Sequence, residues 1–120
     1  MSLLSNRTYK LVNPRNKTVG VATTLTSNDS GTTYIATAAI TMTLPSAVEG
    51  LRFRFLVNGA NALTIAPQTG EYMPTPSTGA YGNATFSISA DAAGEYIELE
   101  CFEATKWSVT SYIGTWTKAS

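Results

Sequence analysis

The stretch from Ile40 to Phe55 reads ITMTLPSAVEGLRFRF, two alternating segments on either side of a corner that contains a proline and a glycine. Successive side chains of a strand point to opposite faces, so residues 40–44 place isoleucine, methionine and leucine on one face and threonines on the other. Residues 51–57 likewise place leucine, phenylalanines and valine on one face, opposite two arginines and Leu56. The pattern predicts two strands, each with one face in a core.

Similar short segments continue along the chain from Thr18, with turn signals roughly every ten residues, which is typical of a sandwich or barrel. We count about eight to ten strands and no convincing helix. The predicted fold is all-β: an antiparallel β-sandwich or jelly-roll-like barrel with an extended N-terminal arm. The predicted strands read TVGVATTL, TYIA, ITMTL, LRFRFLV, ALTIA, TFSIS, YIELECF, WSVTSYI and GTWTK.

Two connections stand out. Asn58-Gly59 lies between alternating runs and predicts a two-residue hairpin, because its primed turn needs the positive φ that this pair tolerates. Residues 67–83 form the longest irregular stretch and contain three prolines and two tyrosines. Loops of this length are uncommon in compact domains and are often functional.

Composition excludes several classes of function. The 120 residues fit one domain and include no histidine and a single cysteine, Cys101. The lack of histidine argues against an ordinary zinc site and against histidine-dependent nucleophiles, so we expect neither an enzyme nor a cofactor. No apolar run is long enough for a signal peptide or a membrane span, and the lone cysteine fits a reducing compartment, so we expect synthesis in a cytoplasm and no membrane partner.

Charge is unevenly distributed although the net charge is zero. The first 28 residues carry four basic residues and no acidic one, which leaves an excess of four negative charges on the remainder. We therefore divide the chain into a basic arm, residues 1–17, and a β-sandwich body, residues 18–120. The acidic body has no basic stripe with interleaved aromatics, so no nucleic-acid partner is expected. The arm residues expected to bind a partner are Arg7, Tyr9, Lys10, Leu11, Arg15 and Lys17.

The charged residues of the body favour structural roles. Glu98 and Glu100 share a strand face, which permits a carboxylate pair for glycoside hydrolysis or a cation site. No neighbouring feature of the sequence would bury one of them and raise its pKa, so a solvated face is the better interpretation. Arg52 and Arg54 also share a face; they could hold an acidic partner, but we favour cross-strand pairs with the two glutamates.

The aromatic residues leave more alternatives. Trp107 and Cys101 alternate with apolar neighbours and are predicted in the core. Trp116 follows a glycine near the end of the chain, and either closes the sandwich as a lid or anchors a subunit contact. Sugar stacking by Trp116, Tyr72 or Tyr81 is the remaining alternative.

The order of the segments resembles a β-domain found in virion proteins of tailed bacteriophages. The resemblance spans about residues 24–117: an alternating strand, Leu-Pro-x-Ala, a glycine, a strand ending in Phe-x-Val, a Thr-Ile-x-Pro segment and a closing Trp-x-Val and Gly-Thr-Trp. The matching residues are Leu44, Pro45, Ala47, Gly50, Phe55, Val57, Thr64, Ile65, Pro67, Gly94, Trp107, Val109, Gly114, Thr115 and Trp116.

Such domains occur in capsid decoration (cement) proteins and in head and tail fibres, so the resemblance implies a structural role in the virion and a homotrimer. A single such domain with a basic arm favours a decoration protein on the capsid surface, with the major capsid protein as its partner. The alternative from another class is a receptor- or carbohydrate-binding tip domain of a fibre.

Overall fold

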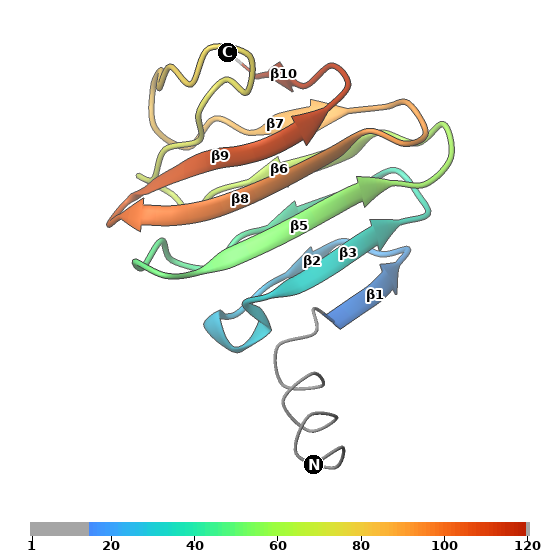
Figure 1. Cartoon of the computed structure of the whole chain (residues 1–120), viewed down its shortest axis with the longest axis horizontal. Helices are drawn as coiled ribbons and strands as arrows, with labels where there is room; N and C mark the ends of the chain where they lie inside the picture. The colour runs from blue at the N-terminus through green and yellow to red at the C-terminus, as the bar shows by residue number, and fades with distance from the viewer. Residues whose placement is uncertain (1–14, 120) are drawn as a thin grey trace, which may run out of the picture.

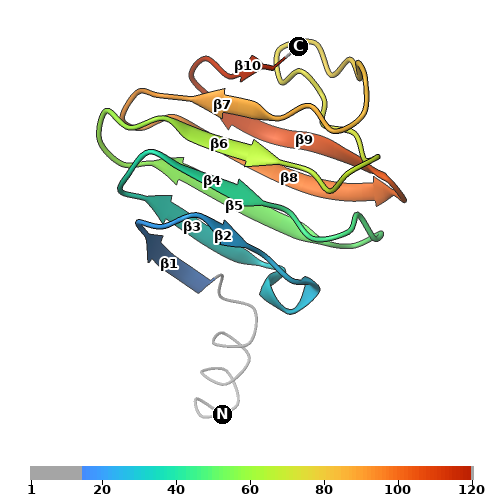
Figure 2. The same ribbon diagram turned by 180° about the vertical axis from the view of Figure 1, so that it is seen from behind.

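The computed structural model describes residues 15–119 and consists of ten strands in two five-stranded sheets that pack face to face (Figures 1 and 2). Sheet A has the order β1-β3-β5-β8-β9 and sheet B the order β10-β7-β6-β4-β2. The all-β sandwich predicted from the sequence is confirmed. The strands are β1 (Arg15–Val19), β2 (Thr23–Thr24), β3 (Thr32–Ala36), β4 (Ile40–Thr43), β5 (Arg52–Val57), β6 (Leu63–Ala66), β7 (Ile88–Ala90), β8 (Tyr96–Glu103), β9 (Lys106–Ile113) and β10 (Thr117–Lys118).

Residues 15–66 form what we call the parallel coil. Its six strands alternate between the sheets: β1, β3 and β5 lie in sheet A, and β2, β4 and β6 lie in sheet B. Each strand from β1 to β4 pairs in parallel with the next one in its own sheet, two strands later in the chain. The arrangement is that of a short solenoid, in which every turn adds one strand to each layer.

Residues 88–118, the antiparallel cap, complete both sheets. β8 pairs antiparallel with β5 and with β9, and β7 pairs antiparallel with β6 and with β10. The predicted antiparallel arrangement is therefore correct for the cap and wrong for the coil, where the four pairings are parallel. The reason is that an alternating pattern reveals which face of a strand is buried but not which strand lies beside it.

The predicted hairpin at Asn58-Gly59 is also wrong. β5 and β6 lie in different sheets, and the connection between them is a corner that crosses the sandwich. Gly59 does adopt the positive φ that its sequence predicts, +94°. The Asn-Gly pair thus correctly predicted a turn at this position. Because β5 pairs with β3 on one edge and with β8 on the other, β6 has no place beside it and lies in the other sheet.

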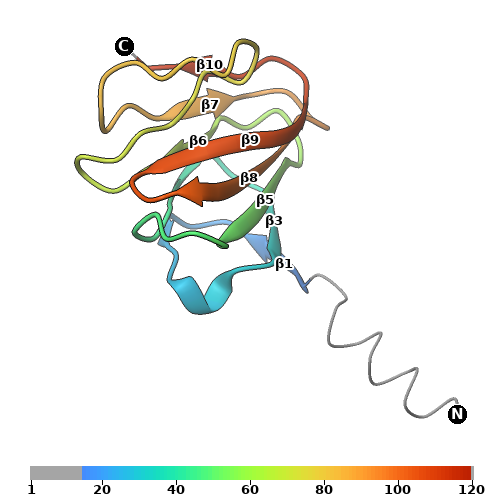
Figure 3. The same cartoon turned by 60° about the vertical axis from the view of Figure 1, so that its left-hand side comes forward.

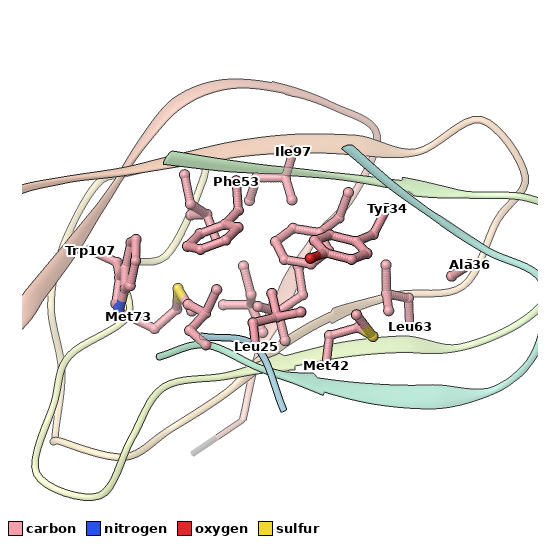
Figure 4. Packing of buried hydrophobic residues seen from close by; sticks show 14 of the residues in the cluster. Leu25, Tyr34, Ala36, Met42, Phe53, Leu63, Met73, Ile97 and Trp107 are labelled. Carbon is pink, nitrogen blue, oxygen red and sulfur yellow. The ribbon is translucent and has the colours of Figure 1, made fainter. Parts of the chain in front are cut away.

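The core lies between the sheets and follows the predicted alternation. The inward side chains of β5, Phe53 and Phe55, are fully buried, and so is Trp107 of β9. Phe55 stacks on Tyr34 at a ring distance of 5.7 Å, and Phe53 contacts Trp107 at 5.9 Å. Figure 4 shows Trp107 and Met73 at one end of this cluster and Tyr34 further along between the sheets.

The long connection between β6 and β7 lies beside β9 and β10 (Figure 3). It is fixed to the body at several points. Both carboxylate oxygens of Glu71 accept a hydrogen bond from the backbone N–H of Ala47, each at 3.0 Å. The backbone N–H of Tyr72 donates to the carbonyl of Thr105 at 2.8 Å, next to the turn between β8 and β9. Met73 is fully buried, so the connection also contributes to the core.

Candidate functional site

A row of mostly apolar residues crosses all five strands of sheet A on the face that points away from sheet B. The strand registers place these residues opposite one another, one from each strand. Their side chains are half-buried or exposed. On the three central strands, β3, β5 and β8, the residues immediately before and after them in the sequence are buried. In strand order the row, which we call the apolar row, consists of Thr18, Ile35, Leu56, Tyr96 and Ile113.

The neighbouring rows on the same face are polar. Arg54 donates from Nε to Oε2 of Glu98 at 2.9 Å, across the β5–β8 pairing. Arg52 donates from Nε and Nη2 to Oε1 of Glu100, at 3.1 and 2.8 Å. The cross-strand pairs predicted from the sequence are confirmed. This face therefore combines one apolar row with ion pairs of zero net charge.

The environment of Glu98 fits a structural carboxylate. The Thr110 hydroxyl donates to its Oε1 at 2.7 Å, and this bond, together with the Arg54 guanidinium, lowers its pKa against the opposing effect of burial. A general acid needs the opposite shift, towards a raised pKa. The arrangement does not split the environments of Glu98 and Glu100 in the way that a carboxylate pair in glycoside hydrolysis requires.

The structure places two of the predicted arm residues in the body. β1 begins at Arg15, so the expected boundary between Lys17 and Thr18 falls inside this strand. Arg15 donates from Nη2 to the carbonyls of Asn28 and Ser30, both at 3.2 Å. Arg7, Tyr9, Lys10 and Leu11 lie outside the described residues.

Arg15 and Lys17 occupy a defined place on this edge strand. They pair with Thr32 and Tyr34, both buried, and so lie on the face of β1 that points towards sheet B. Inward-pointing charges on an edge strand discourage the addition of a further strand. These two residues therefore protect the edge of sheet A, a role that the sequence alone did not reveal.

Trp116 is only 6% exposed. Its indole N–H lies 3.2 Å from the carbonyl of Tyr96 and 3.3 Å from that of Ile113, so its polar atom is satisfied within the chain. This geometry matches the lid alternative. It leaves little of the side chain for a second subunit, and a subunit contact at Trp116 stays a prediction.

The two tyrosines of the long connection do not form a common stacking platform. Their rings meet edge to face, with centroids 6.4 Å apart. The Tyr81 hydroxyl donates to the carbonyl of Trp107 at 2.6 Å, and Lys106 Nζ lies 5.6 Å from the centre of the Tyr81 ring. Because Trp116 is buried elsewhere, Tyr72, Tyr81 and Trp116 are not gathered into one sugar-binding surface.

Within residues 15–119, no group of three or more histidine, cysteine or acidic side chains is placed to hold a metal ion. Cys101 is buried, as predicted, and burial raises the pKa of its thiol. A raised pKa keeps the thiol protonated and poorly nucleophilic. No helix in the same part of the chain is long and apolar enough to span a membrane.

One member of the apolar row stands out in the sequence alone. Its signal is an apolar residue at a position where the alternation requires a polar one: Leu56 shares its face with Arg52 and Arg54. The continuation of the row across the sheet depends on the strand registers, which the sequence does not supply. Searches of this sequence against protein-family models and against curated proteins gave no match.

Proposed function

We propose that this protein is a capsid decoration protein of a tailed bacteriophage, made in the host cytoplasm and bound to the major capsid protein on the surface of the assembled shell. The observation that carries the proposal is the apolar row, which crosses a five-stranded sheet with two rows of paired charges on one side of it. Protein interfaces commonly combine an apolar centre with a polar rim. The sequence resemblance to phage virion β-domains supplies the identity of the partner.

The proposed mechanism is thermodynamic. A protein that binds the assembled shell but not the free subunits stabilises the shell by mass action. The rigid body contributes a preformed surface, which reduces the entropy lost on binding. No catalytic group is required for this role, and the ion pairs of sheet A serve as a polar border that fixes orientation more than affinity.

A homotrimer is part of the proposal. With Trp116 buried, the better candidate for the subunit contact is Tyr112 of β9, which is 40% exposed and lies outside the apolar row. Closed symmetric assembly would cover this side chain on all three copies and leave the apolar row free for the shell. Sedimentation should show a trimer, and a monomer at all working concentrations, on and off the shell, would contradict this part.

The test is binding of purified protein to expanded capsids that lack it. Ile113→Glu places a charge in the apolar row at an exposed position, so folding should be retained, and binding should weaken about tenfold or more. Leu56→Glu, in the middle of the row, should weaken it further. Thr41→Glu, at an exposed position on the opposite face of the sandwich, is the matched control and should bind normally.

Circular dichroism of each variant separates loss of binding from loss of fold. Undiminished binding by both row variants would refute the proposed face. The arm is tested separately by removing residues 2–14, which leaves β1 intact; replacing Arg7 and Lys10 by glutamine should weaken binding and flatten its dependence on salt. If the shortened chain binds as well as the full chain, the arm takes no part.

The second candidate function is a carbohydrate-binding tip domain of a fibre. It is favoured by one observation, a hollow beside Tyr81 that is lined by aromatic and polar side chains. The two functions differ in the number of copies that each virion carries.

A further inference from the structure

A hollow of about 390 Å³ lies between the long connection and the last strand, β10. Its size falls within the range of about 300–1,000 Å³ that is usual for small-molecule sites. It lies away from the apolar row, since its lining comes from residues 75–86 and from the end of the chain after β9. The lining residues that matter here are Thr75, Tyr81, Gly82, Asn83, Phe86 and Lys118.

Lys118 contributes an unusual group to this lining. It is the last residue of β10, where it pairs with Ile88 of β7. Its ammonium nitrogen is shielded from solvent and has no hydrogen-bond partner among residues 15–119. A buried cation without a partner is costly, and burial accordingly lowers the pKa of Lys118. An anion that enters the hollow would supply the missing partner.

The position of Lys118 depends on Gly82. A Cβ atom at residue 82 would lie 3.1 Å from Lys118 Nζ and 3.8 Å from its Cε. The first distance is tight and the second is an ordinary van der Waals contact, so the absence of a side chain at residue 82 leaves room for the ammonium group. The backbone of Ala119 is also fixed, through a hydrogen bond of 2.9 Å from its N–H to the carbonyl of Ser87.

The rest of the lining suits a ring with hydroxyl groups. Tyr81 is held by the hydrogen bond from its hydroxyl to the carbonyl of Trp107, and Phe86 adds a second aromatic side chain. Asn83 and Thr75 bring amide and hydroxyl groups that can bond to sugar hydroxyls. Lys118 is the one cationic side chain of the lining, which matches a single carboxylate better than a phosphate dianion.

We propose that this hollow binds an acidic monosaccharide unit of the uronic acid type, with Lys118 bound to the carboxylate, the aromatic side chains against the ring, and Asn83 and Thr75 bonded to hydroxyls. The site is additional to the capsid-binding face. It gives the protein a means of contacting an acidic polysaccharide.

The experiment is a titration of the full-length protein, followed by amide and lysine side-chain NMR, with sodium glucuronate, glucose and sodium acetate as separate probes. Glucuronate should bind at least about tenfold more tightly than either other probe, because only glucuronate carries both the ring and the charge. The chemical-shift changes caused by glucuronate should be largest around Gly82 and Lys118. The pKa of Lys118 should rise when glucuronate is bound.

Lys118→Met retains the alkyl stem and removes the charge, and it should reduce glucuronate affinity to that of glucose. Gly82→Ala should weaken binding by displacing the ammonium group. Thr41→Met, which places the same side chain at an exposed position on β4 outside the lining of the hollow, is the control and should bind as the unaltered protein does.

Failure of glucuronate to bind would overturn the proposal. Equal binding of acetate and glucuronate would show an anion site without sugar recognition, and would overturn it as well. Retained affinity in Lys118→Met would refute the assigned role of that residue. None of these outcomes affects binding to capsids through the apolar row, so the two proposals fail separately.

Discussion

The parallel coil and the antiparallel cap build the same two sheets by different routes. In the coil, each strand from β1 to β5 is followed by a corner that carries the chain to the other sheet, so strands that pair within the coil are two strands apart in the sequence. In the cap, β8 and β9 are adjacent in both sequence and space and are joined by a tight turn. The coil therefore depends on buried side chains to define its pairing, whereas the cap also has local turn chemistry to define it.

The largest effect should come from the core of the coil. Phe55→Ala removes a fully buried ring that stacks on Tyr34, and we expect a loss of about 3–5 kcal/mol in the free energy of unfolding. Leu56→Ala, one residue further on the opposite face, should cost less than about 1 kcal/mol. Urea denaturation measures both; similar losses for the two variants would contradict the assignment of faces in β5.

A second comparison sets a corner of the coil against the hairpin turn of the cap. Gly59→Val forces a β-branched residue into positive φ, with its Cβ 3.0 Å from Asn61 Nδ2, and should cost about 2–3 kcal/mol. Thr105 already adopts a φ of 72° in the turn between β8 and β9. Thr105→Gly relieves this strain and should be neutral or stabilise by up to about 1 kcal/mol. Destabilisation by both changes would show that the two turns are not differently strained.

Glu95 joins the two crossovers of the cap. Its carboxylate accepts hydrogen bonds from the backbone N–H groups of Thr115, Ala92 and Asp91, at 2.7, 2.9 and 3.1 Å. These bonds, the one from Thr115 foremost, lower the pKa of Glu95 despite the effect of burial.

Because the folded pKa is lowered, the carboxylate stabilises the protein above its unfolded pKa of 4.5, and this contribution is lost as the pH falls from there through the folded value. Glu95→Gln should cost about 1–2 kcal/mol at pH 7 and should reduce the loss of stability below pH 4.5. Thermal unfolding across this pH range is the measurement. If the pH dependence of stability is the same in Glu95→Gln as in the unaltered protein, the Glu95 carboxylate does not make this contribution.

The smallest effect should lie at the seam between the two regions, where β5 pairs with β8. Arg52 and Glu100 form an ion pair there with the arginine side chain 50% exposed. A double-mutant cycle with Arg52→Met and Glu100→Gln should give a coupling of about 0.2–1 kcal/mol, reduced by salt. A coupling well above this range would mean that the seam is held by charge and not by the core beneath it.

Much of the body was predictable because single strands carry their own pattern. The alternation in β4 and β5 gave the buried faces, and the spacing of Arg52 and Arg54 against Glu98 and Glu100 gave the ion pairs. Sheet membership was not predictable, since a strand with one apolar face fits equally well beside a parallel or an antiparallel neighbour.

The candidate sites were less accessible to sequence reasoning. The apolar row depends on four strand registers, and the ammonium group of Lys118 owes its burial to a glycine 36 positions earlier in the chain. Trp116 illustrates the opposite case: its position after Gly114 predicted either a lid or a subunit anchor, and its burial matches the lid, while a subunit contact stays a prediction.

The most direct test of the proposed function is the number of copies of this chain in each virion, counted by quantitative mass spectrometry against the major capsid protein. A decoration protein that covers the shell predicts hundreds of copies per particle, in a fixed ratio to the major capsid protein. A handful of copies would contradict the account and identify the chain as part of a fibre or tail.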